Sequence, residues 1–167
     1  MQKVKIGLIS DTHGFLDDKI YEYFKNVDEI WHAGDIGSLE VIDKLKAFKP
    51  TRIVYGNIDS GEIRRETAEY LNFNCENINV LITHIAGKPG KYVKRAHELI
   101  EKFHPKLFIC GHSHILLVKK DPHFDMLWMN PGAYGVKGFH QVRTALRFEI
   151  INDLITNLEV IEMKMRA

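Results

Sequence analysis

Seven residues that can bind metal ions stand at or just after the ends of short apolar segments of this sequence. They are Asp11, His13, Asp35, Asn57, His84, His112 and His114. In open α/β folds, ligands bind beyond the carboxyl ends of the strands, so residues that are far apart in the sequence can meet there. We therefore expect these seven side chains to form one site.

The donor atoms of this set are carboxylate oxygens, an amide oxygen and imidazole nitrogens, without a thiolate. Such donors suit Mn²⁺, Fe, Zn²⁺, Co²⁺ or Ni²⁺, and suit neither an iron–sulfur cluster nor an all-oxygen Ca²⁺ cage. Seven ligands are too many for one tetrahedral site, so two metals that share a bridging carboxylate fit the set better. Two metals about 3.5–4 Å apart can stabilise both the attacking and the leaving oxygen of a displacement at phosphorus.

The motifs that carry these residues differ in strength. Asp-x-His and Gly-Asp each occur by chance in many proteins. The Gly-His-Ser-His motif at 111–114 is stronger evidence, because two histidines two positions apart in a loop have no good explanation as core residues. Gly34, Gly56 and Gly111 each precede a proposed ligand, and glycine allows a tight turn and a close approach of the backbone to an ion.

Strands and helices alternate in the first half of the chain. Apolar, β-branched runs predict strands at 4–10, 29–33 and 52–55, and helical spacing predicts helices at 17–26 and 38–47. This order predicts parallel strands joined by right-handed crossovers.

The second half is richer in strands. One helix is expected at 91–103, and strands are expected at 70–75, 78–83, 107–110, 115–120, 126–129, 144–150 and 158–163. Two stacked sheets covered by helices would accommodate both halves in one α/β fold.

Length and composition indicate one globular domain over residues 1–167. The 23 basic and 22 acidic residues give a net charge of +1, which argues against a broad nucleic-acid-binding surface. We see no signal peptide and no apolar run of membrane-spanning length. Cys75 and Cys110 lie in strand-like sequence outside any Cys-x-x-Cys pair, so we expect reduced, buried thiols and a cytoplasmic protein.

The ordered series of motifs, from Asp11 to the turn at 130–132, resembles the calcineurin-like metallophosphoesterase superfamily. It is most similar to the compact YfcE-like phosphodiesterases of bacteria and archaea. The resemblance implies a four-layer α-β-β-α sandwich, in which two mixed sheets are flanked by helices. It also implies hydrolysis of phosphodiesters by in-line attack of a water or hydroxide that bridges two divalent metals. Mn²⁺ is favoured, with Ni²⁺, Co²⁺, Zn²⁺ or Fe as alternatives.

The same resemblance divides the ligands between two metals. The first metal would be bound by Asp11, His13 and His114, and Asp35 would bridge the pair. The second would be bound by Asn57, His84 and His112. Asp35, Asn57 and His84 would also act in catalysis, with Asn57 facing a phosphoryl oxygen of the substrate.

One position departs from the family pattern. Many members have a histidine directly after the Asn of the Gly-Asn motif, where it is thought to protonate the leaving group, and this chain has Ile58. General acid catalysis is often worth about 10²–10⁴ in rate, so we expect weak turnover on poor leaving groups. His140, in the glycine-rich loop after 130–132, is the candidate for a substitute acid.

Other polar residues have simpler explanations. We expect His32 to pack in the core beside Trp31, although it could also support the metal ligands from behind. Exposed or helix-end positions are expected for His97, His104 and His123. A solvated surface explains Arg64, Arg65, Lys88 and Lys91 at least as well as phosphate binding does.

Two other functions compete with a small-molecule phosphodiesterase. A retromer subunit that resembles this family uses the fold as a protein-binding scaffold, but it departs from the metal motifs that this chain keeps. A nuclease would share the chemistry, but near-neutral charge and the lack of interleaved aromatic and basic residues disfavour it. We expect a small phosphodiester substrate and no membrane contact, and the sequence leaves a homo-oligomer open.

Overall fold

The structure is a computed structural model that describes residues 2–165. Its central strands are buried on both faces, and alternate side chains face opposite layers. In β5 (Ile78–Thr83), Val80 and Ile82 belong to one buried cluster, whereas Leu81 belongs to another. This alternation places every central strand between two apolar layers.

The first sheet combines strands from both ends of the chain in the order β12-β11-β1-β2-β3. Its strands are β1 (Lys3–Ile9), β2 (Glu29–His32), β3 (Thr51–Ile53), β11 (Arg143–Ile151) and β12 (Leu154–Met163). The pairs β1–β2 and β2–β3 are parallel, as the strand–helix–strand order predicted. β11 and β12 extend the sheet on the other side of β1 by antiparallel pairing.

The second sheet has the order β4-β5-β8-β10-β9. Its other strands are β4 (Tyr70–Cys75), β8 (Leu107–Ile109), β9 (Leu116–Asp121) and β10 (Met126–Pro131). The pairs β5–β8 and β8–β10 are parallel, and the outer pairs β4–β5 and β9–β10 are antiparallel. Both sheets are therefore mixed, as expected.

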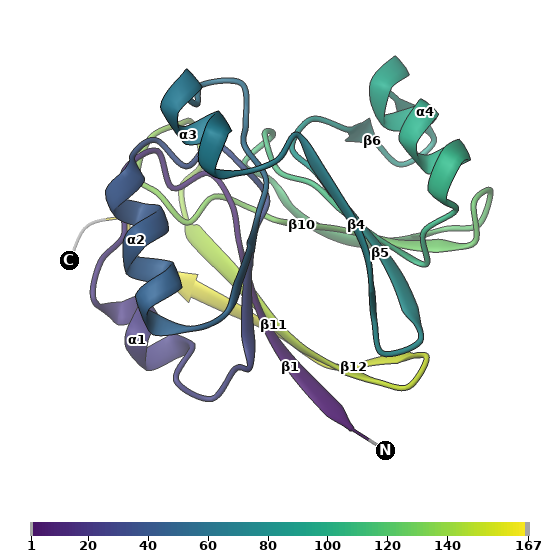
Figure 1. Cartoon of the computed structure of the whole chain (residues 1–167), viewed down its shortest axis with the longest axis horizontal. Coiled ribbons are helices and arrows are strands. Elements are labelled where there is room, and N and C mark those ends of the chain that lie inside the picture. Colours follow the sequence, from purple (N-terminus) through teal and green to yellow (C-terminus); the bar gives the residue numbers. More distant parts are fainter. Residues whose placement is uncertain (1, 166–167) are drawn as a thin grey trace.

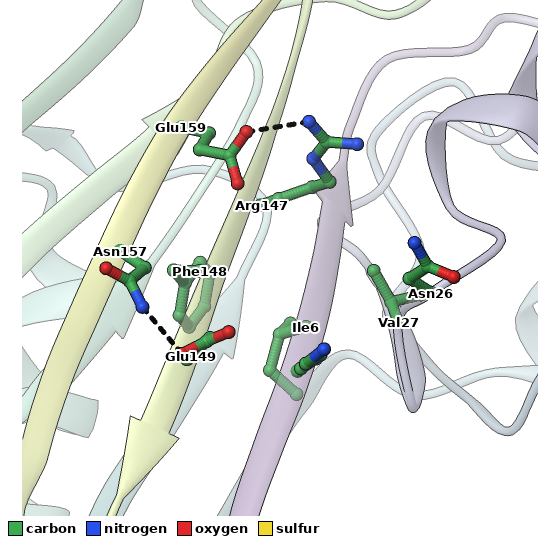
Figure 2. Close-up of a pocket in the computed structure, with 9 residues that line it drawn as sticks. Ile6, Asn26, Val27, Arg147, Phe148, Glu149, Asn157 and Glu159 are labelled. Carbon is green, nitrogen blue, oxygen red and sulfur yellow. Dashed lines mark hydrogen bonds and ion pairs between the residues drawn. The ribbon is translucent and has the colours of Figure 1, made fainter.

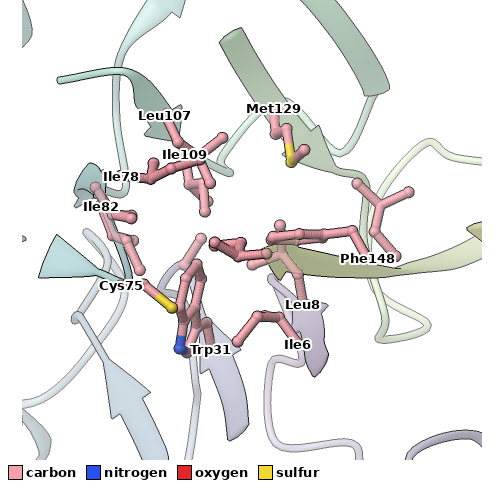
Figure 3. Packing of buried hydrophobic residues seen from close by; sticks show 14 of the residues in the cluster. Ile6, Leu8, Trp31, Cys75, Ile78, Ile82, Leu107, Ile109, Met129 and Phe148 are labelled. Carbon is pink, nitrogen blue, oxygen red and sulfur yellow. The ribbon is translucent and has the colours of Figure 1, made fainter. Parts of the chain in front are cut away.

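Helices cover the outer faces of the two sheets (Figure 1). They are α1 (Lys19–Tyr23), α2 (Leu39–Phe48), α3 (Gly61–Glu66) and α4 (Lys94–Phe103). Apolar residues of α1, α2 and α3 pack with the first sheet, and those of α4 pack with the second. A third cluster fills the space between the sheets, with Trp31, Leu107 and Phe148 among its members (Figure 3). The predicted four-layer sandwich is confirmed.

The structure also corrects several predicted elements. The helix expected at 17–26 is only α1, and the helix expected from residue 91 begins at Lys94. A short hairpin of β6 (Gly87–Lys88) and β7 (Lys91–Tyr92) precedes α4, where the positive φ angles of Gly87 and Gly90 permit tight turns. α3 was not predicted.

The last strand also differs from the prediction. β12 begins at Leu154, before the expected residue 158, because a turn at Asn152 closes a hairpin with β11. Asn152 takes the left-handed conformation that such turns require. Within residues 2–165, no helix is long and apolar enough to cross a membrane.

Candidate metal centre

The seven predicted ligands lie on loops that follow the carboxyl ends of strands in both sheets. Backbone hydrogen bonds hold these loops together. The amide of Asp11 donates to Gly34 O at 2.9 Å, and the amide of His13 donates to Asp35 O at 3.0 Å. The amide of Gly111 donates to His84 O at 3.0 Å. Two bonds join the loops of one sheet to those of the other: His84 Nδ1 lies 2.7 Å from Ala33 O, and the amide of His112 donates to Asp11 Oδ2 at 3.1 Å. The loops therefore meet at one edge of the sandwich.

Carboxylate and imidazole donors fall into two groups that can each hold a metal ion. One group is formed by Asp11, His13 and His114. The other is formed by Asp35, His84 and His112. Within each group, the ligand atoms lie within 4.8 Å of one another. The histidines are divided as the family resemblance implied, and Asp35, the expected bridge, stands with the second group.

Asp35 belongs to the second group and also reaches the first. Its Oδ2 is 3.5 Å from Nε2 of His13 in the first group and 3.2 Å from Nε2 of His84 in the second. Its Oδ1 accepts a hydrogen bond from the amide of Ile58 at 3.1 Å, which fixes the carboxylate plane. A carboxylate in this place is suited to bridge two ions.

Asn57 and Ile58 lie on the exposed side of the centre. Asn57 lines a pocket together with His84, so the structure brings it to the edge of the second group. The side chain of Ile58 is 47% exposed and carries no proton that it could transfer. The described part of the chain thus brings all seven predicted ligands into one region.

Within the described part of the chain, three donor atoms in the centre are buried without any hydrogen-bond partner. They are Asp11 Oδ1, His13 Nε2 and His84 Nε2. Burying a polar atom without a partner costs about 1–3 kcal/mol, so such atoms are rare in folded proteins. Asp11 Oδ1 also faces Nε2 of His114 at 3.2 Å. A bound cation would satisfy all three atoms, and the donor set fits divalent transition metals.

The backbone at the centre is strained. Among the described residues, ten other than glycine have a positive φ, and five of these are proposed ligands: Asp11, His13, Asp35, His112 and His114. Outside glycine, this conformation costs of order 1–3 kcal/mol and tends to cluster at functional sites. The fold therefore holds these side chains in directions that relaxed loops would not give them.

The electrostatics of the centre favour positive charge. Burial alone would raise the pKa of Asp11, but the imidazoles of His114, His13 and His84 hold it well below its usual range. Burial likewise opposes ionisation of Asp35, and His84 lowers its pKa in spite of this. The pKa of His84 is raised by Asp35 and Asp11 against the effect of burial.

Asp59 organises the loops that present Asp35 and Asn57. Its buried carboxylate accepts hydrogen bonds from the amides of Ile36, Gly37 and Gly56, at 3.1, 2.9 and 2.8 Å. The sequence places Asp59 in the Gly-Asn motif but gives no sign of this role, because the amides come from two separate loops.

His32 links two of the ligand loops. Its Nδ1 accepts from the amide of Gly34 at 3.0 Å, so its Nε2 carries the proton and donates to Thr12 Oγ1 at 2.9 Å. The hydroxyl of Thr12 in turn donates to Ile36 O at 2.8 Å. His32 is fully buried and supports the loops of Asp11 and Asp35, which is the alternative role that the sequence left open.

His140 contacts a proposed ligand. Its Nδ1 is 3.3 Å from Nδ1 of His114, and its Nε2 donates to Gly135 O at 2.8 Å. Both ring nitrogens are therefore engaged. A role of His140 as the acid stays a prediction, and the contacts favour a role in orienting His114.

The remaining predicted residues lie away from the ligands or at their border. His97 is exposed and faces Glu101, and His104 ends α4. Arg64 lines the pocket beside the second group. Cys75 and Cys110 are both free and buried.

Comparisons with known proteins agree with this picture. The model of the calcineurin-like phosphoesterase superfamily domain matches residues 4–153. A probable metallophosphoesterase of Methanocaldococcus jannaschii is 32% identical over 77% of this chain and 67% of its own length.

Solved structures show the same fold. A predicted phosphoesterase of Streptococcus pneumoniae superposes with a TM-score of 0.71 at 22% identity, over 99% of this chain and 91% of its own. Vps29 of Entamoeba histolytica, solved in complex with Zn²⁺, superposes with a TM-score of 0.70 at 14% identity, over 98% of this chain and 100% of its own.

Proposed function

The chain belongs to the calcineurin-like phosphoesterase superfamily, and from this we propose that it is a dinuclear-metal phosphodiesterase acting on small diesters. One observation carries the proposal. Two groups of metal-binding donors lie side by side and Asp35 reaches both, and three of their donor atoms are buried without a hydrogen-bond partner among residues 2–165. Such a costly arrangement has a physical reason if cations occupy it.

The proposed roles follow the positions of the side chains. Asp11, His13 and His114 would hold one metal, His84, His112 and Asn57 the other, and Asp35 both. Two bound divalent metals would supply Lewis acidity and a nucleophilic water at neutral pH. Asn57, at the exposed border of the centre, would face a phosphoryl oxygen of the substrate.

Leaving-group chemistry limits the rate in this proposal. Ile58 offers no proton to the departing alcohol, and both ring nitrogens of His140 are engaged elsewhere. We therefore expect faster hydrolysis of esters with activated leaving groups, such as p-nitrophenolate, than of alkyl esters. We also propose a cytoplasmic setting, which the two free, buried thiols support.

A non-catalytic scaffold is the main alternative, because several structural neighbours are Vps29 proteins. Their identity to this chain is low, so the likeness concerns the fold alone. Against a scaffold, a protein-binding module has no evident reason to keep buried, unpartnered metal donors in strained loops.

The deciding experiment assays metal-stripped protein on bis-p-nitrophenyl phosphate and on p-nitrophenyl phosphate, with Mn²⁺, Ni²⁺, Co²⁺, Zn²⁺ or Mg²⁺ added back. We expect metal-restored hydrolysis of the diester, with Mn²⁺ the most effective, and its loss in Asp35→Asn. Asp43→Asn, on the exposed face of α2, is the matched control and should stay active. If the protein binds metal but hydrolyses neither ester, a non-catalytic scaffold becomes the better-supported function.

A further inference from the structure

A pocket of about 400 Å³ opens beside the second group of metal donors. Asn57 and His84 belong to its lining, so a substrate phosphate at the metals would lie at one end of it. The rest of the lining includes Tyr55, Arg64, Glu69, Ile85, Val93 and Arg95. One arm of a phosphodiester would therefore extend into this pocket.

A second pocket, shown in Figure 2, differs from the pocket beside the metal donors in its position and in its charged groups. It has a volume of about 230 Å³ and lies along the middle of β1 and β11. Three of its charged groups have partners: Arg147 pairs with Glu159 at 2.7 Å, and Glu149 accepts from Asn157 at 2.7 Å. This pocket does not border the metal donors, and neither Arg147 nor Glu149 offers a charge without a partner.

Arg64 is the fixed cation of the pocket beside the metals. Its Nε donates to Asp59 O at 2.9 Å, and its Nη2 lies 3.3 Å from Asn57 O and 3.5 Å from Gly56 O. Its guanidinium carbon lies 4.7 Å from the centre of the Tyr55 ring. These contacts hold an exposed arginine in one place without using its Nη1 hydrogens.

The charge of Arg64 is not neutralised by a neighbour. Over residues 2–165, its hydrogen-bond partners are backbone carbonyls, and no carboxylate forms an ion pair with it. Arg95, across the pocket, is different, because it forms a two-point pair with Glu69 at 2.8 and 3.2 Å. The pocket therefore presents one available cation, next to the partly exposed apolar side chains of Ile85 and Val93.

We infer that this pocket selects phosphodiesters in which one arm carries a second anionic group, with Arg64 binding that group. The inference rests on the proposed function, since the metals would hold the reacting phosphate. A guanidinium with free, planar N–H donors matches a phosphate or carboxylate in two-point geometry. Ile85 and Val93 would contact the apolar part of the arm between its two charged ends.

Two chromogenic diesters that differ by one phosphate test the inference. They are thymidine 5′-(p-nitrophenyl phosphate) and the same compound with a 3′-phosphate. In each, water adds to phosphorus, the bond to p-nitrophenolate breaks, and a thymidine 5′-phosphate remains. Loss of a charge-assisted hydrogen bond typically changes binding by about 10- to 100-fold. We expect the 3′-phosphate to raise kcat/KM by about that factor in the wild-type protein.

Arg64→Gln should abolish this preference, and Arg65→Gln should keep it. Arg65 is the next residue of the same helix, is exposed, and does not belong to the lining of the pocket. A purely structural role of Arg64 would lower kcat/KM for both diesters by the same factor and leave their ratio unchanged. A missing preference in the wild type, or a preference that survives in Arg64→Gln, would overturn the inference.

A binding measurement separates this inference from the proposed function. Calorimetry on the metal-loaded protein should show thymidine 3′,5′-bisphosphate binding at least about tenfold more tightly than thymidine 5′-monophosphate, and Arg64→Gln should remove the difference. Bis-p-nitrophenyl phosphate, which has no second anionic group, reports the proposed function alone. If it is hydrolysed but the bisphosphate shows no advantage, only the inference fails. If no diester is hydrolysed, calorimetry still decides whether Arg64 binds the anion.

Discussion

A chain of hydrogen bonds sets the protonation of one proposed ligand. Gly135 O can only accept, so His140 Nε2 donates to it, and a neutral His140 is left with a lone pair on Nδ1. That lone pair accepts from Nδ1 of His114, which leaves Nε2 of His114, on the side of Asp11, as the ring nitrogen that would bind a metal. His140 therefore holds His114 in the tautomer that a metal requires.

We predict that His140→Ala lowers metal affinity by about 10- to 100-fold, because the imidazole of His114 loses its orienting partner. Competition with a chromogenic chelator measures this without turnover. His97→Ala, at an exposed position of α4, should bind metal like the wild type. If His140 were instead the acid, the variant would keep its metal affinity and lose rate mainly on poor leaving groups.

His32 makes the folding stability of the metal-free protein depend on pH. Burial lowers the pKa of His32 to about 4 in the folded protein, against 6.5 for a free histidine. Between these values the unfolded chain binds the proton more strongly than the folded chain. This group therefore destabilises the fold as the pH falls from above 6.5 to 4, by about 3 kcal/mol.

We predict that this pH dependence is absent in His32→Gln. The free energy of unfolding, measured with urea from pH 7.5 to 4 on both metal-free proteins, should fall more steeply in the wild type by about 3 kcal/mol. The difference between the two curves isolates His32 from the other titrating groups. Parallel curves would show that His32 is not held neutral.

At the scale of elements, glycines set how closely the ligand loops approach one another. A Cβ at Gly56 would overlap the carboxylate and the amide nitrogen of Asp35. The loop after β3 and the loop after β2 can therefore share one site only if this position has no side chain. The approach also allows Ile36 to donate to Asp59, which holds the Asp35 loop against the loop of Gly56.

Gly56→Ala should therefore displace Asp35. We expect a loss of about 1–3 kcal/mol in the free energy of unfolding, as for other overpacked sites, together with weaker metal binding. Gly61→Ala is the matched control, because its Cβ would only touch the Arg65 side chain at 3.5 Å in the first turn of α3. Denaturant titration measures the free energy of unfolding, and calorimetry measures metal binding. If Gly56→Ala matches the wild type in both, the close approach of the two loops does not depend on glycine.

At the scale of the whole molecule, the layer between the sheets holds the two halves of the site together. Strand ends of the first sheet provide Asp11 and Asp35, and those of the second provide His84 and His112. Their relative position depends on the cluster of Figure 3, to which both sheets contribute. We propose that the chain unfolds as one cooperative domain for this reason.

Leu107→Ala, in the layer between the sheets, should cost about 2–5 kcal/mol, because Leu107 is 0% exposed and its loss leaves a cavity. Leu154→Ala removes the same atoms from a side chain that is 60% exposed and should cost far less. Chemical denaturation followed by both fluorescence and circular dichroism measures the two costs. Two separate transitions would contradict a single domain.

Local patterns in the chain were enough to predict much of the site and of the fold. Strand-like runs that end in Asp, His or Gly-Asn were sufficient to predict that seven donors would lie on strand-end loops. The rule that ligands bind beyond the carboxyl ends of strands depends only on local patterns and on the direction of parallel strands, and both can be read from the sequence. For the same reason β4 and β5 were predicted with the bounds that the structure shows.

Tertiary structure decided what depends on pairs of residues that are distant in the chain. β11 and β12 complete the first sheet, Asp59 binds amides of another loop, and His140 reaches His114 across 26 residues. The availability of Arg64 as an unpaired cation, and the pairing of Arg95, likewise follow from neighbours in space. Local patterns do not encode such contacts, because a hydrogen bond or an ion pair depends on where two loops meet after the sheets have packed.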